Sequence, residues 1–234
     1  MKIDGDKCVS CLLCLPYCPV GAIKQERDEV RIDQDGCIEC GVCIRSGVCS
    51  QGAIYQPDLE WPRVLRSQFS NPLVSHPLTQ IMGRGTAEMK TNDVTGRFRA
   101  GEVGFAIEMG RPGLSTSFRD VETVTMALAG KVDFEPDNPI TSLIDVETGM
   151  FRDETVLAER ALSAIIECKT TEGEALEALN LIREVSEDFT TVFSLCVITR
   201  CQGFEIPFKD VMESNGFEPR INGKTNVGLG RPRA

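Results

Sequence analysis

Apolar and polar residues alternate over residues 103–109, and this two-residue period predicts a half-buried β-strand. A Pro-Gly turn signal follows the strand. A 3.6-residue apolar period then predicts a helix over 118–129, with Ser117 as its N-cap and Gly130 directly after its end. The apolar residues that carry these two patterns are Val103, Phe105, Ile107, Met109, Val121, Val124 and Leu128.

The same kinds of pattern continue towards the C-terminus. Further strands are predicted over 142–146, 163–168 and 192–199. Thr171 and Glu174 have the spacing of a capping box, which predicts that a helix begins there. A short helix near 207–214 precedes a Gly-rich, basic tail. The resulting β-α-β-β-α-β order predicts an α+β fold, in which residues 101–234 form an open-faced sandwich.

Residues 58–100 show no sustained period of either kind. Pro62, Pro72 and Pro77 interrupt this stretch. We therefore expect an extended connector on the protein surface, between a first domain over residues 1–57 and the second domain.

Eight of the eleven cysteines lie in the first 49 residues, in two runs of similar spacing. The runs are Cys8-x2-Cys11-x2-Cys14-x3-Cys18, followed by Pro19, and Cys37-x2-Cys40-x2-Cys43-x5-Cys49. The first three cysteines of the two runs are 29 positions apart and the fourth are 31 apart. The first domain is therefore an internal duplication, with a two-residue insertion in its second copy.

Cysteines at this spacing are typical ligands of iron–sulfur clusters. Two residues between successive cysteines let a tight loop wrap three corners of a cubane cluster, while the fourth ligand comes from elsewhere. In runs of this type the fourth cysteine binds the other cluster. The predicted ligand sets of two [4Fe-4S] clusters are therefore Cys8, Cys11, Cys14 and Cys49 for one, and Cys37, Cys40, Cys43 and Cys18 for the other.

Zinc binding and disulfides are the structural alternatives for these thiols. Zinc favours separated pairs of cysteines, and a C-x2-C-x2-C run crowds a tetrahedral ion. An odd number of cysteines without a visible secretory signal does not suit a disulfide framework. Both alternatives are less well supported than iron–sulfur clusters.

The first domain resembles the bacterial-type two-cluster ferredoxins, down to Cys18-Pro19-Val20-Gly21-Ala22-Ile23. The resemblance implies two [4Fe-4S] centres of low potential and one-electron transfer. The sequence departs from the family pattern at the second run, where five residues separate Cys43 from Cys49 and Ser50 replaces the usual proline. This departure concerns the geometry and potential of the cluster that uses Cys49.

The charge and hydropathy of the chain narrow its partners. The formal net charge of −10 argues against nucleic-acid binding and favours docking to basic partners. No apolar run approaches the length of a membrane-spanning helix. We therefore expect a cytoplasmic protein that does not bind membranes.

The second domain also carries a resemblance. Residues 110–114, Gly-Arg-Pro-Gly-Leu, followed by residues 124–129, Val-Thr-Met-Ala-Leu-Ala, resemble the first strand-to-helix turn of the ACT regulatory domains. Their spacing is longer than the family's. The resemblance implies either a scaffold for dimer contacts and docking, or a sensor of small ligands.

Basic residues of the connector suggest a second kind of site. Residues 82–86 and 90–92, echoed by 224–226 in the tail, could hold a small anion between backbone amides and arginines, although solvated loops explain the same residues. The basic residues between 61 and 112 are Arg63, Arg66, Arg84, Lys90, Arg97, Arg99 and Arg111. His76, the single histidine, is interpreted as a surface or packing residue. Cys168, Cys196 and Cys201 are interpreted as structural thiols.

Together these patterns favour an electron-transfer protein or subunit that passes single electrons to a redox partner protein, as a homo-oligomer or within a complex. No catalytic residues are predicted. Two alternatives remain open: a ferredoxin-fused reductase that acts on a small anionic substrate such as a carboxylate, and an ACT-like regulator gated by a ligand.

Overall fold

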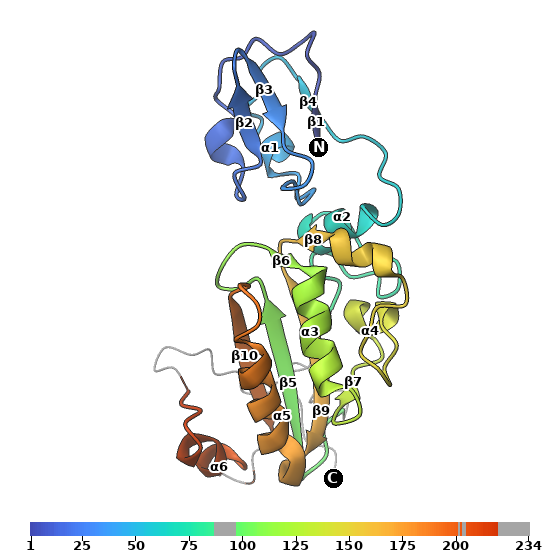
Figure 1. Cartoon of the computed structure of the whole chain (residues 1–234), viewed down its shortest axis with the longest axis vertical. Coiled ribbons are helices and arrows are strands. Elements are labelled where there is room, and N and C mark those ends of the chain that lie inside the picture. The colour runs from blue at the N-terminus through green and yellow to red at the C-terminus, as the bar shows by residue number, and fades with distance from the viewer. Residues whose placement is uncertain (87–96, 201, 203–204, 220–234) are drawn as a thin grey trace.

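The computed structural model describes residues 1–86, 97–200, 202 and 205–219. Figure 1 shows two lobes: residues 1–57, which we call the head, and the described residues from 64 to 219, which we call the body. Helix α2 and strand β8 of the body lie directly under the head. Among the described residues, no helix is long and apolar enough to cross a membrane.

The head is built from short elements that follow the duplication. Two antiparallel pairs, β1 with β4 and β2 with β3, form separate two-stranded sheets. Its apolar core is small and includes Ala22, Ile23, Val30 and Ile32. The elements of the head are β1 (Lys2–Ile3), η1 (Leu15–Tyr17), β2 (Ile23–Glu26), β3 (Glu29–Ile32), α1 (Val42–Arg45) and β4 (Ile54–Tyr55).

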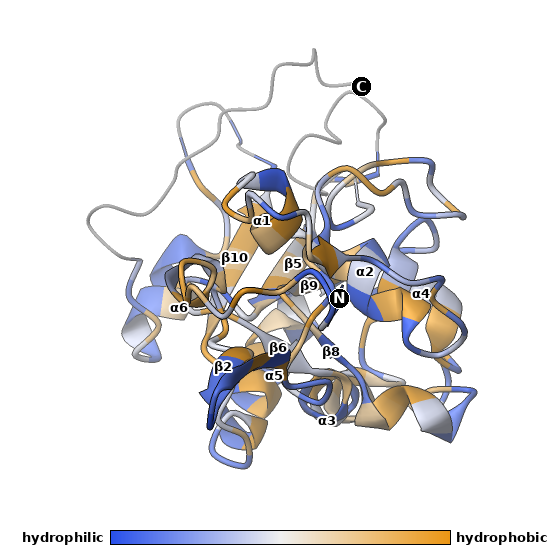
Figure 2. Ribbon diagram, turned by 90° about the horizontal axis from the view of Figure 1, so that it is seen from above, coloured by the Kyte–Doolittle hydropathy of each residue, from blue (hydrophilic) through white to orange (hydrophobic). Residues whose placement is uncertain are grey.

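The body contains a four-stranded sheet in the order β10-β5-β9-β7, and all neighbouring strands are antiparallel. Helices α3 and α5 cover one face of this sheet, as the view from above shows (Figure 2). The elements of the body are α2 (Val64–Ser70), β5 (Glu102–Met109), β6 (Thr116–Ser117), α3 (Phe118–Leu128), β7 (Asp133–Phe134), α4 (Pro139–Leu143), η3 (Glu154–Ala158), β8 (Arg160–Ala161), β9 (Ala164–Thr171), α5 (Glu172–Val185), β10 (Phe193–Thr199) and α6 (Lys209–Ser214).

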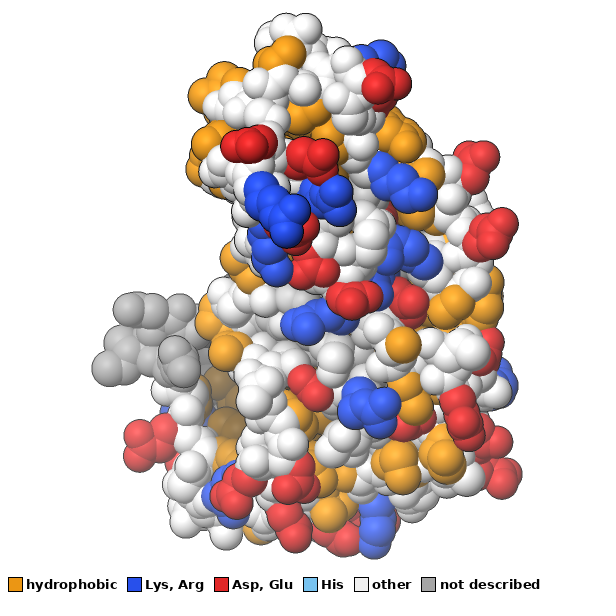
Figure 3. All heavy atoms as spheres, turned by 45° about the horizontal axis from the view of Figure 1, so that its top comes forward, with side chains coloured by type: hydrophobic (Ala, Val, Ile, Leu, Met, Phe, Trp, Pro, Cys, Tyr) orange, Lys and Arg blue, Asp and Glu red, His pale blue; other side chains and the backbone are white. Residues whose placement is uncertain are grey.

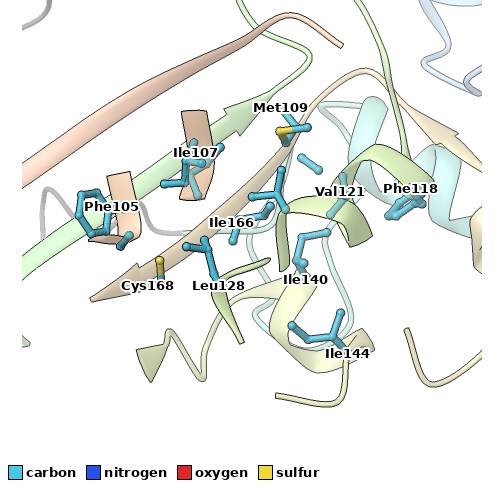
Figure 4. Close-up of a cluster of buried hydrophobic side chains, with 14 of the residues drawn as sticks. Phe105, Ile107, Met109, Phe118, Val121, Leu128, Ile140, Ile144, Ile166 and Cys168 are labelled. Atoms are coloured by element: carbon cyan, nitrogen blue, oxygen red, sulfur yellow. The ribbon is translucent and has the colours of Figure 1, made fainter. Parts of the chain in front are cut away.

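The core of the body lies between the sheet and its two helices (Figure 4). Alternate residues of β5 and β9 point towards the helices because successive side chains of a strand face opposite sides. Phe118 begins α3 and makes edge-to-face contacts with Phe69 and Phe151, at ring-centroid distances of 5.4 and 5.7 Å. These contacts join α3 to α2 and to the loop before η3.

Most of the elements expected in residues 101–234 are present, in the β-α-β-β-α-β order of a mixed α and β fold. Ser117 caps α3 as predicted, because its Oγ accepts a hydrogen bond from the backbone N–H of Asp120 at 3.0 Å. Thr171 precedes α5, but Glu174 accepts hydrogen bonds from the hydroxyls of Thr170 and Thr171, both at 2.9 Å. This arrangement differs from the reciprocal capping box.

The strand predicted over 142–146 is wrong. Residues Pro139–Leu143 form helix α4. The strand that follows α3 along the chain is β7, at Asp133–Phe134. The Asn138 side chain caps α4 by accepting from the backbone N–H of Ile140 at 2.8 Å. Asn at an N-cap followed by Pro at the first position is a helix start, and it outweighs the apolar residues that follow.

The expected extended connector over 58–100 also differs from the structure. It contains helix α2, whose Leu65 and Phe69 are 1% and 2% exposed within the core of the body. Further along, the Phe98 ring lies against Gly104 on the face of the sheet opposite the helices, where a Cβ at position 104 would be 2.3 Å from the ring. Helix α2 and Phe98 therefore pack as part of the body, whereas other apolar side chains of the stretch, such as Leu73 and Leu78, are exposed.

Candidate functional site

The eight cysteines of the two runs line two separate cavities in the head. The outer cavity is lined by Cys8, Cys11, Cys14 and Cys49 together with apolar side chains. The inner cavity is lined by Cys18, Cys37, Cys40 and Cys43, again with apolar side chains. Each cavity thus takes three cysteines from one run and the last cysteine of the other.

The backbone between the cysteines has the same unusual shape in both copies. Ser10 and Leu12 adopt positive φ angles of 51° and 64° around Cys11, and Glu39 and Gly41 repeat this at 54° and 71°. When successive residues alternate between negative and positive φ angles, their backbone N–H groups point into the same concave space. Such a space favours negatively charged groups. The loops are therefore shaped to enclose an anionic group such as a thiolate-bound cluster.

The fourth cysteine of each run is held in an equivalent way. Cys18 Sγ accepts a hydrogen bond from the backbone N–H of Ala22 at 3.1 Å, and Cys49 Sγ accepts one from Ala53 at 3.3 Å. The two-residue insertion lies before Cys49, and the hydrogen bond that follows Cys49 matches the one that follows Cys18.

Burial sets the two cavities apart. Cys37, Cys40 and Cys43 are only 7–8% exposed, whereas Cys11 is an exposed residue. Burial raises the pKa of Cys43 to about 11 and raises the pKa of Cys40 as well. In the outer cavity, burial raises the pKa of Cys14, whereas the N–H of Ala53 lowers the pKa of the Cys49 thiol. The thiols of Cys40 and Cys43 are therefore easier to ionise beside a compensating positive charge, such as bound iron.

The four cysteines of each set line a cavity, and their side chains do not meet at a single position. Within the part of the chain that the structure describes, no group of three or more His, Cys, Asp or Glu side chains is arranged to hold a single metal ion. Four thiols that line a cavity without meeting at one position suit a cluster of several atoms better than one tetrahedral ion.

The inner cavity lies at the junction with the body, where charged side chains of both signs gather (Figure 3). Arg66 of α2 donates from Nη1 to the carbonyl oxygen of Cys37 at 2.7 Å and forms an ion pair with Glu159. Arg63 pairs with the fully buried Glu39, with Nη2 at 2.6 Å from Oε1. On the same side, Arg45 donates to the carbonyl oxygen of Cys40 at 2.7 Å.

Residues 1–63 match the family described as 4Fe-4S dicluster domain. A ferredoxin-like protein in the vnf region of Azotobacter vinelandii is 40% identical over 60 residues, which cover 24% of this chain and 92% of that protein. Through this segment, the chain belongs to the 4Fe-4S dicluster ferredoxin family. The ferredoxin head is an iron–sulfur, electron-transport unit.

Other relatives match the ferredoxin head over less of their own length. A protein named Ferredoxin 7Fe, from Hydrogenibacillus schlegelii, is 43% identical over 51 residues, or 20% of this chain and 63% of that protein. Pyruvate synthase subunit PorD of Methanothermobacter marburgensis is 44% identical over 41 residues, or 18% of this chain and 47% of the subunit. An uncharacterized Methanocaldococcus jannaschii protein is 45% identical over 53 residues, or 22% of this chain, but the match covers only 13% of that protein. No solved structure matches the chain.

The remaining candidate residues take structural positions. His76 is 5% exposed and packs against Phe69, and its Nδ1 accepts from the backbone N–H of Leu78 at 3.3 Å. Cys168 is fully buried in the body core and Cys196 is half-buried. Cys201 and residues 90–92 and 224–226 lie outside the described residues.

Four of the arginines expected around an anion, Arg63, Arg66, Arg84 and Arg97, pair with carboxylates of the chain. These ion pairs are Arg63 with Glu39, Arg66 with Glu159, Arg84 with Glu108, and Arg97 with Glu135 and Asp137. Sequence reasoning identified the arginines but missed their partners. The Arg66 partner is 93 positions away, so no local pattern could have shown it.

Proposed function

We propose that the chain is an electron-transfer subunit that relays single electrons through two [4Fe-4S] clusters to a redox partner protein. The observation that carries this proposal is the pair of cavities, each lined by four cysteines drawn from both runs. The family match over residues 1–63 supports the chemistry. The relatives named as pyruvate synthase subunits support a role within a complex.

In this proposal Cys8, Cys11, Cys14 and Cys49 bind the outer cluster, and Cys37, Cys40, Cys43 and Cys18 bind the inner one. The clusters supply the reversible one-electron chemistry. The chain's own residues hold the thiolates in place, donate N–H groups to the sulfurs of Cys18 and Cys49, and bury Cys37, Cys40 and Cys43. Exposed Cys11, with Val9 and Leu13 at 64% and 59% exposure, makes the outer cavity the side from which electrons arrive or leave.

Reductive titration of the anaerobically purified full chain tests this function. The proposal expects the chain to accept about two electrons from dithionite, one per cluster. Cys18→Ser should remove the inner cluster and Cys49→Ser the outer one, so that each variant accepts about one electron. Cys196→Ala, which changes a thiol outside both cavities, is the control and should accept as many as the wild type. An electron uptake near zero in the wild type contradicts the proposal.

One feature of the body favours a second function, that of an ACT-like sensor of a small ligand. The hydroxyls of Ser115 and Ser163 are buried beside the turn at Gly110 and have no hydrogen-bond partner among the described residues. Buried hydroxyls are normally satisfied, so a ligand or a water at this turn would account for them. A thermal shift of the full chain in the presence of free amino acids, lost in Ser163→Ala, would favour the sensor. Unchanged melting across all twenty amino acids would count against it.

A further inference from the structure

Arg66 joins the body to the backbone around the inner cavity. It is 4% exposed, and its Nη1 donates to the carbonyl oxygens of Gln34, Asp35 and Cys37 at 2.9, 3.0 and 2.7 Å. Its Nε faces the carboxylate of Glu159, which follows η3 and is 8% exposed. The positive charge of Arg66, from the body, therefore contacts the backbone of Cys37, which lines the inner cavity.

A charge in this position acts on the redox chemistry of the cavity. Reduction adds one negative charge to a cluster and changes no covalent bond in the protein. A nearby guanidinium stabilises the added charge, and the effect is stronger for a buried group such as Arg66, at 4% exposure, than for an exposed one. The Glu159 carboxylate has the opposite sign and offsets part of the effect. Glu39, the other buried carboxylate nearby, is already balanced by Arg63 and by the Met1 amino group.

The outer cavity has a different environment. The carbonyl oxygens of Cys14 and Cys49 accept hydrogen bonds from backbone N–H groups of Tyr17 and Gly52, at 3.1 and 3.0 Å. The outer cavity also opens to solvent at Cys11, where water weakens the influence of distant charges. The two cavities should therefore differ in their affinity for an electron.

We infer that Arg66 is a positioning residue that raises the reduction potential of the inner cluster, and that Glu159 limits the increase. An electron that enters from a one-electron donor at the outer cavity then rests on the inner cluster, next to the body. This inference rests on the proposed function, since it needs both clusters to be present.

Redox titration followed by electron paramagnetic resonance tests the inference on the full chain, with the inner signal assigned by its loss in Cys18→Ser. Arg66→Met should lower the inner potential enough to change the ratio of reduced to oxidised cluster at least tenfold, which is about 59 mV for one electron. Glu159→Gln should shift the inner potential in the opposite direction, because it leaves the guanidinium unopposed. Arg66→Lys, which keeps the charge, should stay closer to the wild type than Arg66→Met.

The opposite signs separate an electrostatic role from a structural one. If the ion pair only held the two lobes together, Arg66→Met and Glu159→Gln would shift the potential in the same direction, and the inference would be overturned. An unchanged inner potential in both variants would overturn it too. Arg31→Met removes an exposed charge of the head and is the matched control, expected to leave both potentials unchanged.

Iron analysis distinguishes a failure of the proposed function from a failure of the role inferred for Arg66. A wild-type chain without iron contradicts the proposed function itself. Variants with full iron but without opposite shifts contradict only the role of Arg66. If Arg66→Met alone loses iron, the inner potential of Glu159→Gln decides whether Arg66 acts through its charge. This variant keeps all three hydrogen bonds from Arg66 to the head.

Discussion

The head and the body reach a folded state by different means. Among the described residues, the buried apolar cluster of the head holds seven residues, and two of these are cysteines of the inner cavity, whereas that of the body holds twenty-three. Small domains rarely bury enough apolar surface to fold without a disulfide or a metal. The comparison indicates that the stability of the head depends on its ligands, while that of the body depends on packing.

Removal of iron should have the largest effect, and it should fall on the head alone. Because both proposed clusters join the first run to the second, loss of the two together frees both halves of the head. Incubation with a chelator under mildly oxidising conditions should abolish amide protection over residues 1–57, as measured by hydrogen exchange. The strands β5 and β9 should stay protected. Loss of protection in both lobes together would break the comparison.

A large cavity in the body core should produce the second largest effect. Phe118 is fully buried between Phe69 and Phe151. Phe118→Ala should lower the free energy of unfolding of the body by about 3–5 kcal/mol, measured by urea denaturation. The absorbance of the clusters should be unchanged under native conditions. Leu73→Ala, at a side chain 66% exposed, is the control and should cost less than about 0.5 kcal/mol.

Removal of the helix cap should have a smaller effect on the same lobe. Ser117→Ala deletes the acceptor for the Asp120 N–H at the start of α3, and should cost about 1 kcal/mol. Ser117→Asp keeps an acceptor and adds a negative charge at the helix N-terminus, so it should recover most of the loss. Equal destabilisation by both substitutions would show that the cap does not act through this hydrogen bond.

The pH dependence of the body should show the smallest effect. Burial lowers the pKa of His76 from its ordinary value of 6.5. The unfolded chain therefore binds a proton at a higher pH than the folded chain, and stability falls as the pH is lowered through 6.5. The melting temperature of the body should decrease over this range. His76→Gln should flatten the decrease, since the chain has no other histidine.

Local patterns were enough to predict most of the body. The alternation of Val103 to Met109 and the capping residue Ser117 act over a few residues, and both β5 and α3 are present. Helix α2 escaped prediction because Leu65 and Phe69 gain their stability from the distant core and not from a local pattern. The N-cap at Asn138 was a local signal that the apolar period obscured.

The site shows the same division between local and distant information. The spacing of the cysteines predicted that Cys18 belongs with the second run and Cys49 with the first, and the cavities are lined by those sets. That these cysteines bind clusters stays a prediction. The environment of the inner cavity could not be predicted, because Arg66 and Glu159 approach it from distant parts of the chain.

The iron and acid-labile sulfide content of the anaerobically purified full chain tests the central claim most directly. Two [4Fe-4S] clusters held by crossed sets of four cysteines predict about eight iron and about eight sulfide per chain. Values near four of each would leave one of the two cavities without a cluster. Iron without sulfide, or neither, would contradict the account.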